Sequence, residues 1–271
     1  MPRIKYPYEF DPKKRRIAKI YRRDKLLFYF LGLIISLSTG LLILFSGLNI
    51  SIRDFVLQYP LPTLFYGFLI LSIFTITSFP LSFYSTFIYD SKFKLIRYKL
   101  SGWFKEYLKS NLIYYTLSLI VISVLYFSIR TFSPWWVYAG MFYIIFSTTI
   151  NYIFPLFIVP FMWKTEPYKD KPMRRKILNL CRKLGVVNIR NVFVVKESEK
   201  SVRSNAFFYG IGNQQKMALF DNLLHDFIKD EVETVVGHEL GHYVNRDIIR
   251  GLVLESILIF PILFIVDYLV G

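Results

Sequence analysis

Two of the three histidines in this chain stand four residues apart, with a glutamate directly after the first, in the stretch HELGH. Residues at this spacing share one face of a helix, so the imidazoles of His238 and His242 can reach one ion. Zinc accepts neutral imidazole nitrogen at about 2.0–2.1 Å. Glu239 can take a proton from a water that attacks a peptide carbonyl and return it to the leaving amine. The pattern predicts a zinc peptidase with two histidine ligands and Glu239 as general base.

Other polar residues near the motif have simpler interpretations. Asn245 and Asp247 follow it closely and are candidates for hydrogen bonds that support the ligands. His225 is expected to be an exposed helix residue, and the single cysteine, Cys181, a small core residue. The alternative for the motif itself is a pair of helix histidines at a membrane interface with no metal.

A catalytic zinc site needs a third protein ligand. Glu255 lies 255 − 242 = 13 positions beyond His242, which is about 20 Å further along a continuous helix. It also falls within an apolar run, where a carboxylate is costly. Glu231 and Glu233 precede the motif and fit roles at a helix N-terminus. We therefore expect the third ligand to lie beyond Gly271 and the sequence as given to hold zinc weakly.

The elements that carry this motif belong to a membrane protein. The chain has 271 residues, of which 54% are hydrophobic and 19% aromatic, too apolar for an ordinary soluble domain. Several runs have the roughly 20 residues that a spanning helix needs. The predicted spans are 26–48, 61–83, 112–129, 136–161 and 249–270, with Pro80, Pro155 and Pro160 as kinks or ends.

The positive charge indicates an orientation rather than a nucleic-acid partner. The net charge is +15, and much of it lies beside the apolar runs, where Lys and Arg set membrane topology. Residues 1–25 and 92–109 are strongly basic, whereas the loops after the first and third spans hold only Arg53 and Arg130. We therefore expect the N-terminus and residues 164–248 to be cytoplasmic, and no nucleic acid to bind.

Residues 164–248 have the pattern of a small α+β zincin-like domain between four spans in 1–163 and a fifth in 249–271. The stretch KPMRRKILNLCRKLG reads as an amphipathic helix closed by Gly185. NVFVVK, SNAFFYG and KMALF are strand-like, and IGNQQ separates the last two. Asp221 begins a helix, and DEVE predicts a capping box with Asp230 as N-cap.

Beyond the zinc motif, four stretches occur in the order and spacing of a known family. They are FPLSFYSTFIYDSKFKL, INYIFPLFIVPFMWKTEPYKDKPMRRKI, SVRSNAFFYGIGNQQKMALFDNLL and EVETVVGHELGHYVNRD. Over roughly residues 60–271 the chain resembles the integral-membrane CAAX prenyl endopeptidases and their prokaryotic relatives. The resemblance implies a helical membrane chamber, zinc on His238 and His242, and a peptide laid beside an edge strand at Asn205 and Ala206.

The chain differs from this family in two respects. The family places a glutamate ligand in a Glu-x-x-x-Asp pattern one span further on, and it carries an acidic loop that YDSKFKLIRYKL lacks. The expected function is a membrane zinc endopeptidase acting on peptide or protein substrates, lipidated or membrane-bound ones among them, in a prokaryotic cell membrane. The alternatives are a quality-control protease of the HtpX type, which usually has fewer spans before its soluble domain, and a truncated, non-catalytic membrane scaffold.

Overall fold

The structure is a computed structural model that describes residues 12–153, 155–210 and 215–270. The chain divides into two compact units, Met1–Lys92 and Phe93–Gly271. Each unit is described here by itself.

The first unit is helical. Its long helices α1 and α3 pack together through hydroxyls of Thr39 and Thr77 that lie 3.1 Å apart. Lys25 of α1 forms an ion pair of 2.7 Å with Asp90, which is almost fully buried, and donates to the carbonyl of Ser85. Ser85 belongs to a π-helical turn, where the regular ladder of hydrogen bonds is interrupted. The helices are α1 (Pro12–Phe45), α2 (Leu48–Val56), α3 (Pro62–Phe83), the π-turn (Tyr84–Ile88) and α4 (Tyr89–Lys92).

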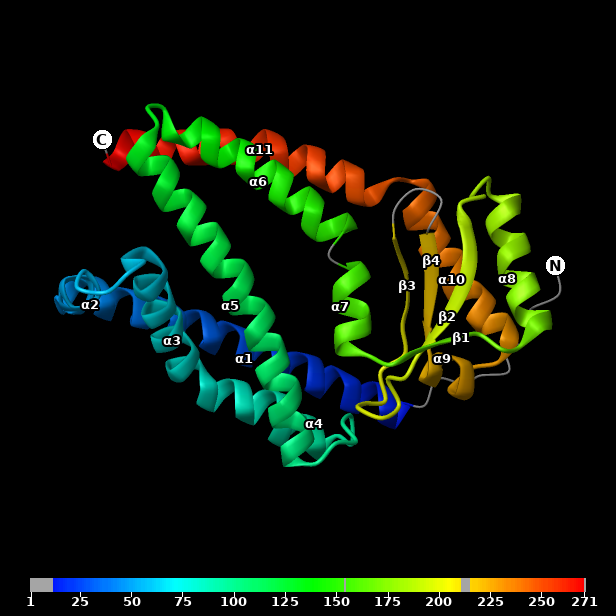
Figure 1. The fold of residues 1–271 in the computed structure, drawn as a ribbon. Coiled ribbons are helices and arrows are strands. Elements are labelled where there is room, and N and C mark those ends of the chain that lie inside the picture. Colours follow the sequence, from blue (N-terminus) through cyan, green and yellow to red (C-terminus); the bar gives the residue numbers. More distant parts are fainter. Residues whose placement is uncertain (1–11, 154, 211–214, 271) are drawn as a thin grey trace. The chain divides into compact units, whose positions relative to one another are not determined.

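The second unit joins apolar helices to a four-stranded sheet (Figure 1). Strand β1 is antiparallel to β2, β2 is parallel to β4, and β4 is antiparallel to β3, which gives the order β1-β2-β4-β3. The elements are α5 (Leu100–Thr131), α6 (Trp135–Tyr152), α7 (Pro155–Met162), β1 (Thr165–Pro167), α8 (Lys171–Lys183), β2 (Ile189–Val195), β3 (Ala206–Tyr209), β4 (Gln215–Phe220), α9 (Asp221–Asp226), α10 (Lys229–Val244) and α11 (Asp247–Val270).

The membrane helices agree with the sequence prediction in number. Among the described residues, four helical stretches are long and apolar enough to cross a bilayer, and the pair α6 and α7 would make a fifth, bent span. The third predicted span, 112–129, lies within α5, which begins earlier, at Leu100. The first three turns of α5 carry charged residues, so the hydropathy pattern did not reveal that the helix extends that far.

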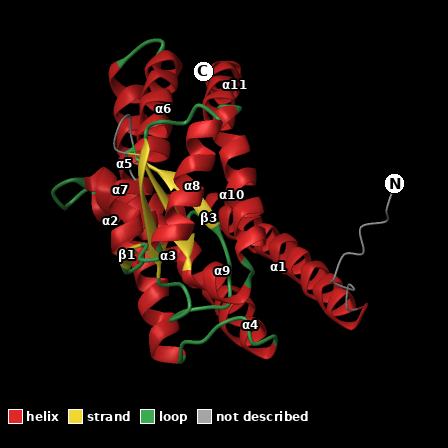
Figure 2. Cartoon of the chain, turned by 90° about the vertical axis from the view of Figure 1, so that its right-hand side faces the viewer, coloured by secondary structure: helices red, strands yellow, loops and turns green. Residues whose placement is uncertain are grey.

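The sheet has a separate core on each face because its side chains alternate. On β4, Met217 and Leu219 are buried with α8 and α10, whereas Ala218 and Phe220 are buried with Val159 of α7. Figures 1 and 2 show α8 and α10 beside the strands. The strands predicted from NVFVVK, SNAFFYG and KMALF are present as β2, β3 and β4. Strand β1 was not predicted, because three residues ending in proline give no strand pattern.

Local signals explain where the helices of the sheet domain begin and end. Asp170 caps α8 by accepting the backbone N–H of Met173 at 3.0 Å, which holds the pKa of its carboxyl below the usual value. Gly185, at φ 75°, ends this helix as predicted. The predicted N-cap at Asp230 is wrong. Helix α10 starts earlier, at Lys229, because the Glu231 carboxylate accepts the N–H of Ile228.

Candidate metal centre

Helix α10 presents its histidines away from the protein core. Val232, Val236 and Leu240 are buried at successive i, i+4 positions and anchor the helix against α8 and the sheet. His238 is two residues after Val236, about 200° further round the helix. It is exposed, as is His242. The apolar stripe therefore fixes the rotation of α10 and points both imidazoles outward.

The two imidazoles converge on one point. Nε2 of His238 and Nε2 of His242 are 3.2 Å apart, and the rings are nearly perpendicular. Two nitrogens bound at about 2.0–2.1 Å to a tetrahedral zinc ion would lie about 3.3 Å apart. The spacing of these atoms therefore fits a zinc ion held by both residues.

Asp247 supports one of these imidazoles. Nδ1 of His242 donates to Oδ2 of Asp247 at 2.7 Å, so in the neutral imidazole Nε2 carries the lone pair that a metal ligand needs. This hydrogen bond raises the pKa of His242, and the charge of Glu239 adds to the effect. Asn245, the other candidate for support, serves as the C-cap of α10, where its backbone N–H donates to Gly241.

The expected continuous helix from the motif into the last span is wrong. Helix α10 ends at Val244, Arg246 adopts a left-handed conformation (φ 54°), and α11 begins at Asp247. Further along α11, the Glu255 carboxylate accepts the hydroxyl of Tyr143 in α6 at 3.2 Å. Among the residues that the structure describes, no group of three or more His, Cys, Asp or Glu side chains could hold a metal ion. The position of the third ligand stays a prediction.

The other residues singled out from the sequence lie as follows. Glu239 is half-buried on α10, next to His238, and its role as general base stays a prediction. His225 is an exposed helix residue, as expected, with 89% of its side chain accessible and a hydrogen bond of 2.8 Å between its Nδ1 and Asp226. Cys181 is fully buried in the core, and burial raises the pKa of its thiol to about 11.

Strand β3, which carries the predicted substrate residues, is an edge of the sheet and contacts α10. Its Phe208 ring lies 5.7 Å from the ring of Tyr243, one residue after the second histidine. Asn205 is exposed directly before the strand, and its side chain accepts the N–H of Ala206. Ala206 is only 1% exposed as a whole residue, so neither its side chain nor its backbone is open to solvent in this structure. The structure thus brings a sheet edge to the helix that carries the histidines.

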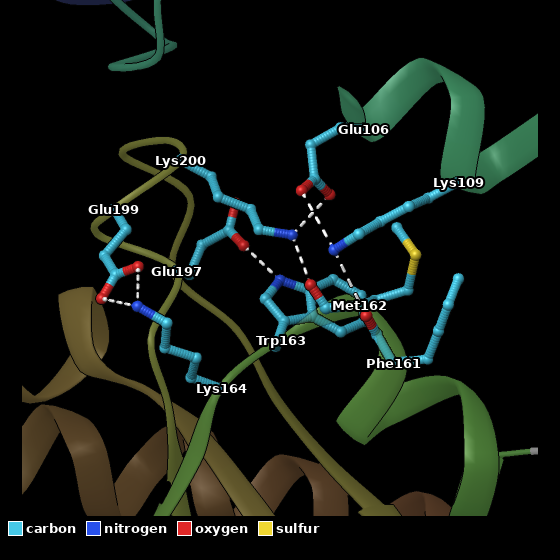
Figure 3. Close-up of polar contacts among 9 residues, drawn as sticks. All are labelled: Glu106, Lys109, Phe161, Met162, Trp163, Lys164, Glu197, Glu199 and Lys200. Atoms are coloured by element: carbon cyan, nitrogen blue, oxygen red, sulfur yellow. Dashed lines mark hydrogen bonds and ion pairs between the residues drawn. The ribbon is translucent and has the colours of Figure 1, made fainter. Parts of the chain in front are cut away.

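Buried polar residues beside β3 were missed from the sequence. Glu197, Ser201 and Asn222 are each at most 6% exposed, and they surround the loop that enters this strand. Figure 3 shows Glu197 with the indole of Trp163, which donates to it at 2.6 Å. The only available signal was a polar Asp-Asn pair directly after the apolar strand β4, and that signal is common at helix starts.

Together, a mainly helical membrane chain and a small mixed-sheet domain with a His-Glu-x-x-His helix are the architecture of the membrane metallopeptidase class. A family profile described as "Peptidase family M48" matches residues 167–271. A second, described as "CAAX prenyl protease N-terminal, five membrane helices", matches residues 6–164. The chain therefore belongs to the CAAX prenyl protease family of M48 peptidases, as the sequence resemblance indicated.

Individual relatives agree with this assignment. "CAAX prenyl protease 1" of Saccharomyces cerevisiae is 28% identical over 72% of this chain and 44% of its own length. "Uncharacterized metalloprotease YhfN" of Bacillus subtilis is 26% identical over 89% of this chain and 57% of its own. The chain spans about half the length of these curated relatives. The crystal structure of S. mikatae Ste24p has the same fold, with a TM-score of 0.83 at 23% identity over 98% of this chain and 64% of that one.

Proposed function

We propose that this chain carries the active-site helix of a membrane-embedded, zinc-dependent endopeptidase. The observation that carries the proposal is the 3.2 Å approach of the two Nε2 atoms on α10. A bound zinc ion would lower the pKa of a water toward about 7 and so supply a nucleophile at neutral pH.

The residues of the chain have separate roles in this proposal. His238 and His242 hold the ion, and Asp247 keeps His242 in the tautomer whose Nε2 is a ligand. The Glu239 carboxylate accepts a proton from the attacking water and later gives it to the leaving amine. The edge strand β3 aligns the substrate as an extended peptide through main-chain hydrogen bonds.

The proposed substrate is a peptide segment of a membrane-bound or lipidated protein. Relatives are named for prenyl proteases, and the apolar helices of this chain keep the site at a membrane. The family assignment favours this type over the HtpX type of quality-control protease.

The decisive experiment compares the wild type with Glu239→Gln in the full-length protein at a saturating zinc concentration, because two histidines alone are expected to hold zinc weakly. We expect the wild type to cleave an extended peptide, and the variant to retain its zinc while losing at least about a hundredfold in kcat. Cleavage at the wild-type rate by Glu239→Gln would rule out its role as the base. A wild type that binds zinc but cleaves no peptide would favour the alternative of a non-catalytic scaffold.

A further inference from the structure

The loop at residues 196–205 leads into strand β3 and is attached to two apolar helices through Lys200. Nζ of Lys200 lies 2.5 Å from a carboxylate oxygen of Glu106 in α5 and also donates to the carbonyl of Met162 (Figure 3). Met162 is the last residue of α7, so its carbonyl has no acceptor role within that helix. A cation is favourable at such a helix C-terminus. Lys200 therefore joins the loop to α5 and α7 at once.

A buried carboxylate fixes the same loop from within. Glu197 is 6% exposed and accepts hydrogen bonds from the indole of Trp163 and from the hydroxyl of Ser201. Trp163 directly follows α7, and the ammonium group of Lys200 lies over its ring, 5.2 Å from the centroid. A buried polar group that loses its partners costs free energy, so these contacts hold the loop in one conformation.

Asn222 holds the next part of the loop. Its side chain is buried, and its amide group donates to the carbonyls of Ser201 at 2.8 Å and Arg203 at 2.9 Å. These bonds use both hydrogens of the amide. Asn222 is the second residue of α9, which follows β4 directly, and β4 is the strand that pairs with β3. It therefore sets the position of the loop relative to the sheet.

Backbone pairing completes the attachment. The N–H of Arg97 donates to the carbonyl of Lys200 at 2.8 Å, and the N–H of Val202 donates to the carbonyl of Leu95 at 3.0 Å. At the other end of the loop, Phe220 of β4 donates to the carbonyl of Asn205. The loop backbone is thus fixed at several successive positions before β3 begins.

We propose that Lys200 and Asn222 are positioning residues, which hold the entry to β3 so that the strand presents its edge to an extended peptide in a fixed register. This inference rests on the proposed peptidase function and on the use of β3 by the substrate. A one-residue slip of a strand exchanges its two faces, so the place where β3 begins decides which groups meet the peptide. Neither residue contacts the reacting atoms.

The test uses Asn222→Ala and Lys200→Met in the zinc-loaded full chain. Loss of either anchor removes peptide binding that is equal in the ground and transition states, so we expect KM to rise about tenfold with kcat little changed. Amide hydrogen exchange of residues 201–207 should become about tenfold faster, while that of β2 and the zinc content stay at wild-type values. Lys200→Arg keeps the cation and should restore both.

A matched control is Lys164→Met, which removes the exposed pair of Lys164 and Glu199 in the same region. Such a pair contributes little, so exchange and KM should not change. Wild-type exchange at 201–207 in both test variants overturns the inference, whether or not the protein cleaves peptides. Faster exchange with an unchanged KM also overturns it, because the two residues would then order the strand without any effect on peptide binding. A wild type that cleaves no peptide instead refutes the proposed function, and the exchange data separate that result from a failure of the two anchors.

Discussion

At the scale of single residues, the carboxylate that binds a candidate metal ligand gives the sharpest prediction. We expect Asp247→Ala to weaken zinc binding about 10–100-fold, because His242 loses the partner that fixes its tautomer and ring orientation. Titration against a competing chelator measures this. The matched control is Asp226→Ala, since Asp226 makes a similar 2.8 Å contact to His225 away from the candidate site. Equal affinities in the wild type and both variants would contradict the role of Asp247.

Residue spacing was sufficient to predict that His238 and His242 lie together, but it did not predict what surrounds them. His238 and His242 are visible as i and i+4 in the sequence, and the structure brings their Nε2 atoms together. The contact of Asp247 with His242 depends on a turn at Asn245 and Arg246, where neither glycine nor proline marks a break. Asn222 is about twenty positions from the carbonyls that it binds, so no local pattern could associate them.

At the scale of elements, the packing of α10 determines where the histidines point. We expect Leu240→Ala to lower the free energy of unfolding by about 2–5 kcal/mol, because it leaves a cavity in a core where Leu240 is fully buried. Denaturant unfolding in detergent measures the loss. Val244→Ala is the control on the same helix, since Val244 is exposed and its truncation should cost less than about 0.5 kcal/mol. Equal losses in the two variants would contradict the packing described here.

The cap of α8 gives a prediction for pH. The hydrogen bond from the N–H of Met173, and next the ion pair with Lys229, lower the pKa of Asp170 below its ordinary value of 3.8. A lowered pKa in the folded state adds stability above the unfolded pKa, and this stability is lost as the pH falls through the folded pKa. The melting temperature of the wild type should therefore exceed that of Asp170→Ala at pH 7, and the difference should shrink below about pH 4. A difference that is constant from pH 7 to pH 3 would contradict this.

Elements with a strong local signal were predicted, and those that depend on distant contacts were not. Gly185 and the amphipathic pattern of α8 gave that helix its end and its buried face. The start of α10 was misplaced because Glu231 accepts the N–H of Ile228. The carboxylates of Asp230 and Glu233, which were expected to form the cap, instead pair with Lys176 of α8. Strand β1 forms only because β2 supplies its partner residues, and its own three residues carry no pattern.

At the scale of the whole molecule, the charge pattern predicts which side of the membrane each segment faces. Cys181 supplies almost no background for thiol labelling, because it is fully buried and its pKa is raised to about 11. In intact cells of a bacterial host, a membrane-impermeant maleimide should label Arg53→Cys. It should label His225→Cys only after the cells are permeabilised, if the zinc domain is cytoplasmic. The reverse pattern would contradict the proposed orientation.

Asp247 combines two structural roles that different residues usually fill. It is the first residue of the apolar helix α11, and it is also the hydrogen-bond partner of a candidate metal ligand. A membrane helix responds to the thickness of its bilayer by tilting, and the first residue of α11 moves when that helix tilts. The contact between Asp247 and His242 therefore gives bilayer thickness a direct route to the candidate metal site. We expect zinc affinity to differ between thin and thick bilayers, and Asp247→Ala to abolish that difference.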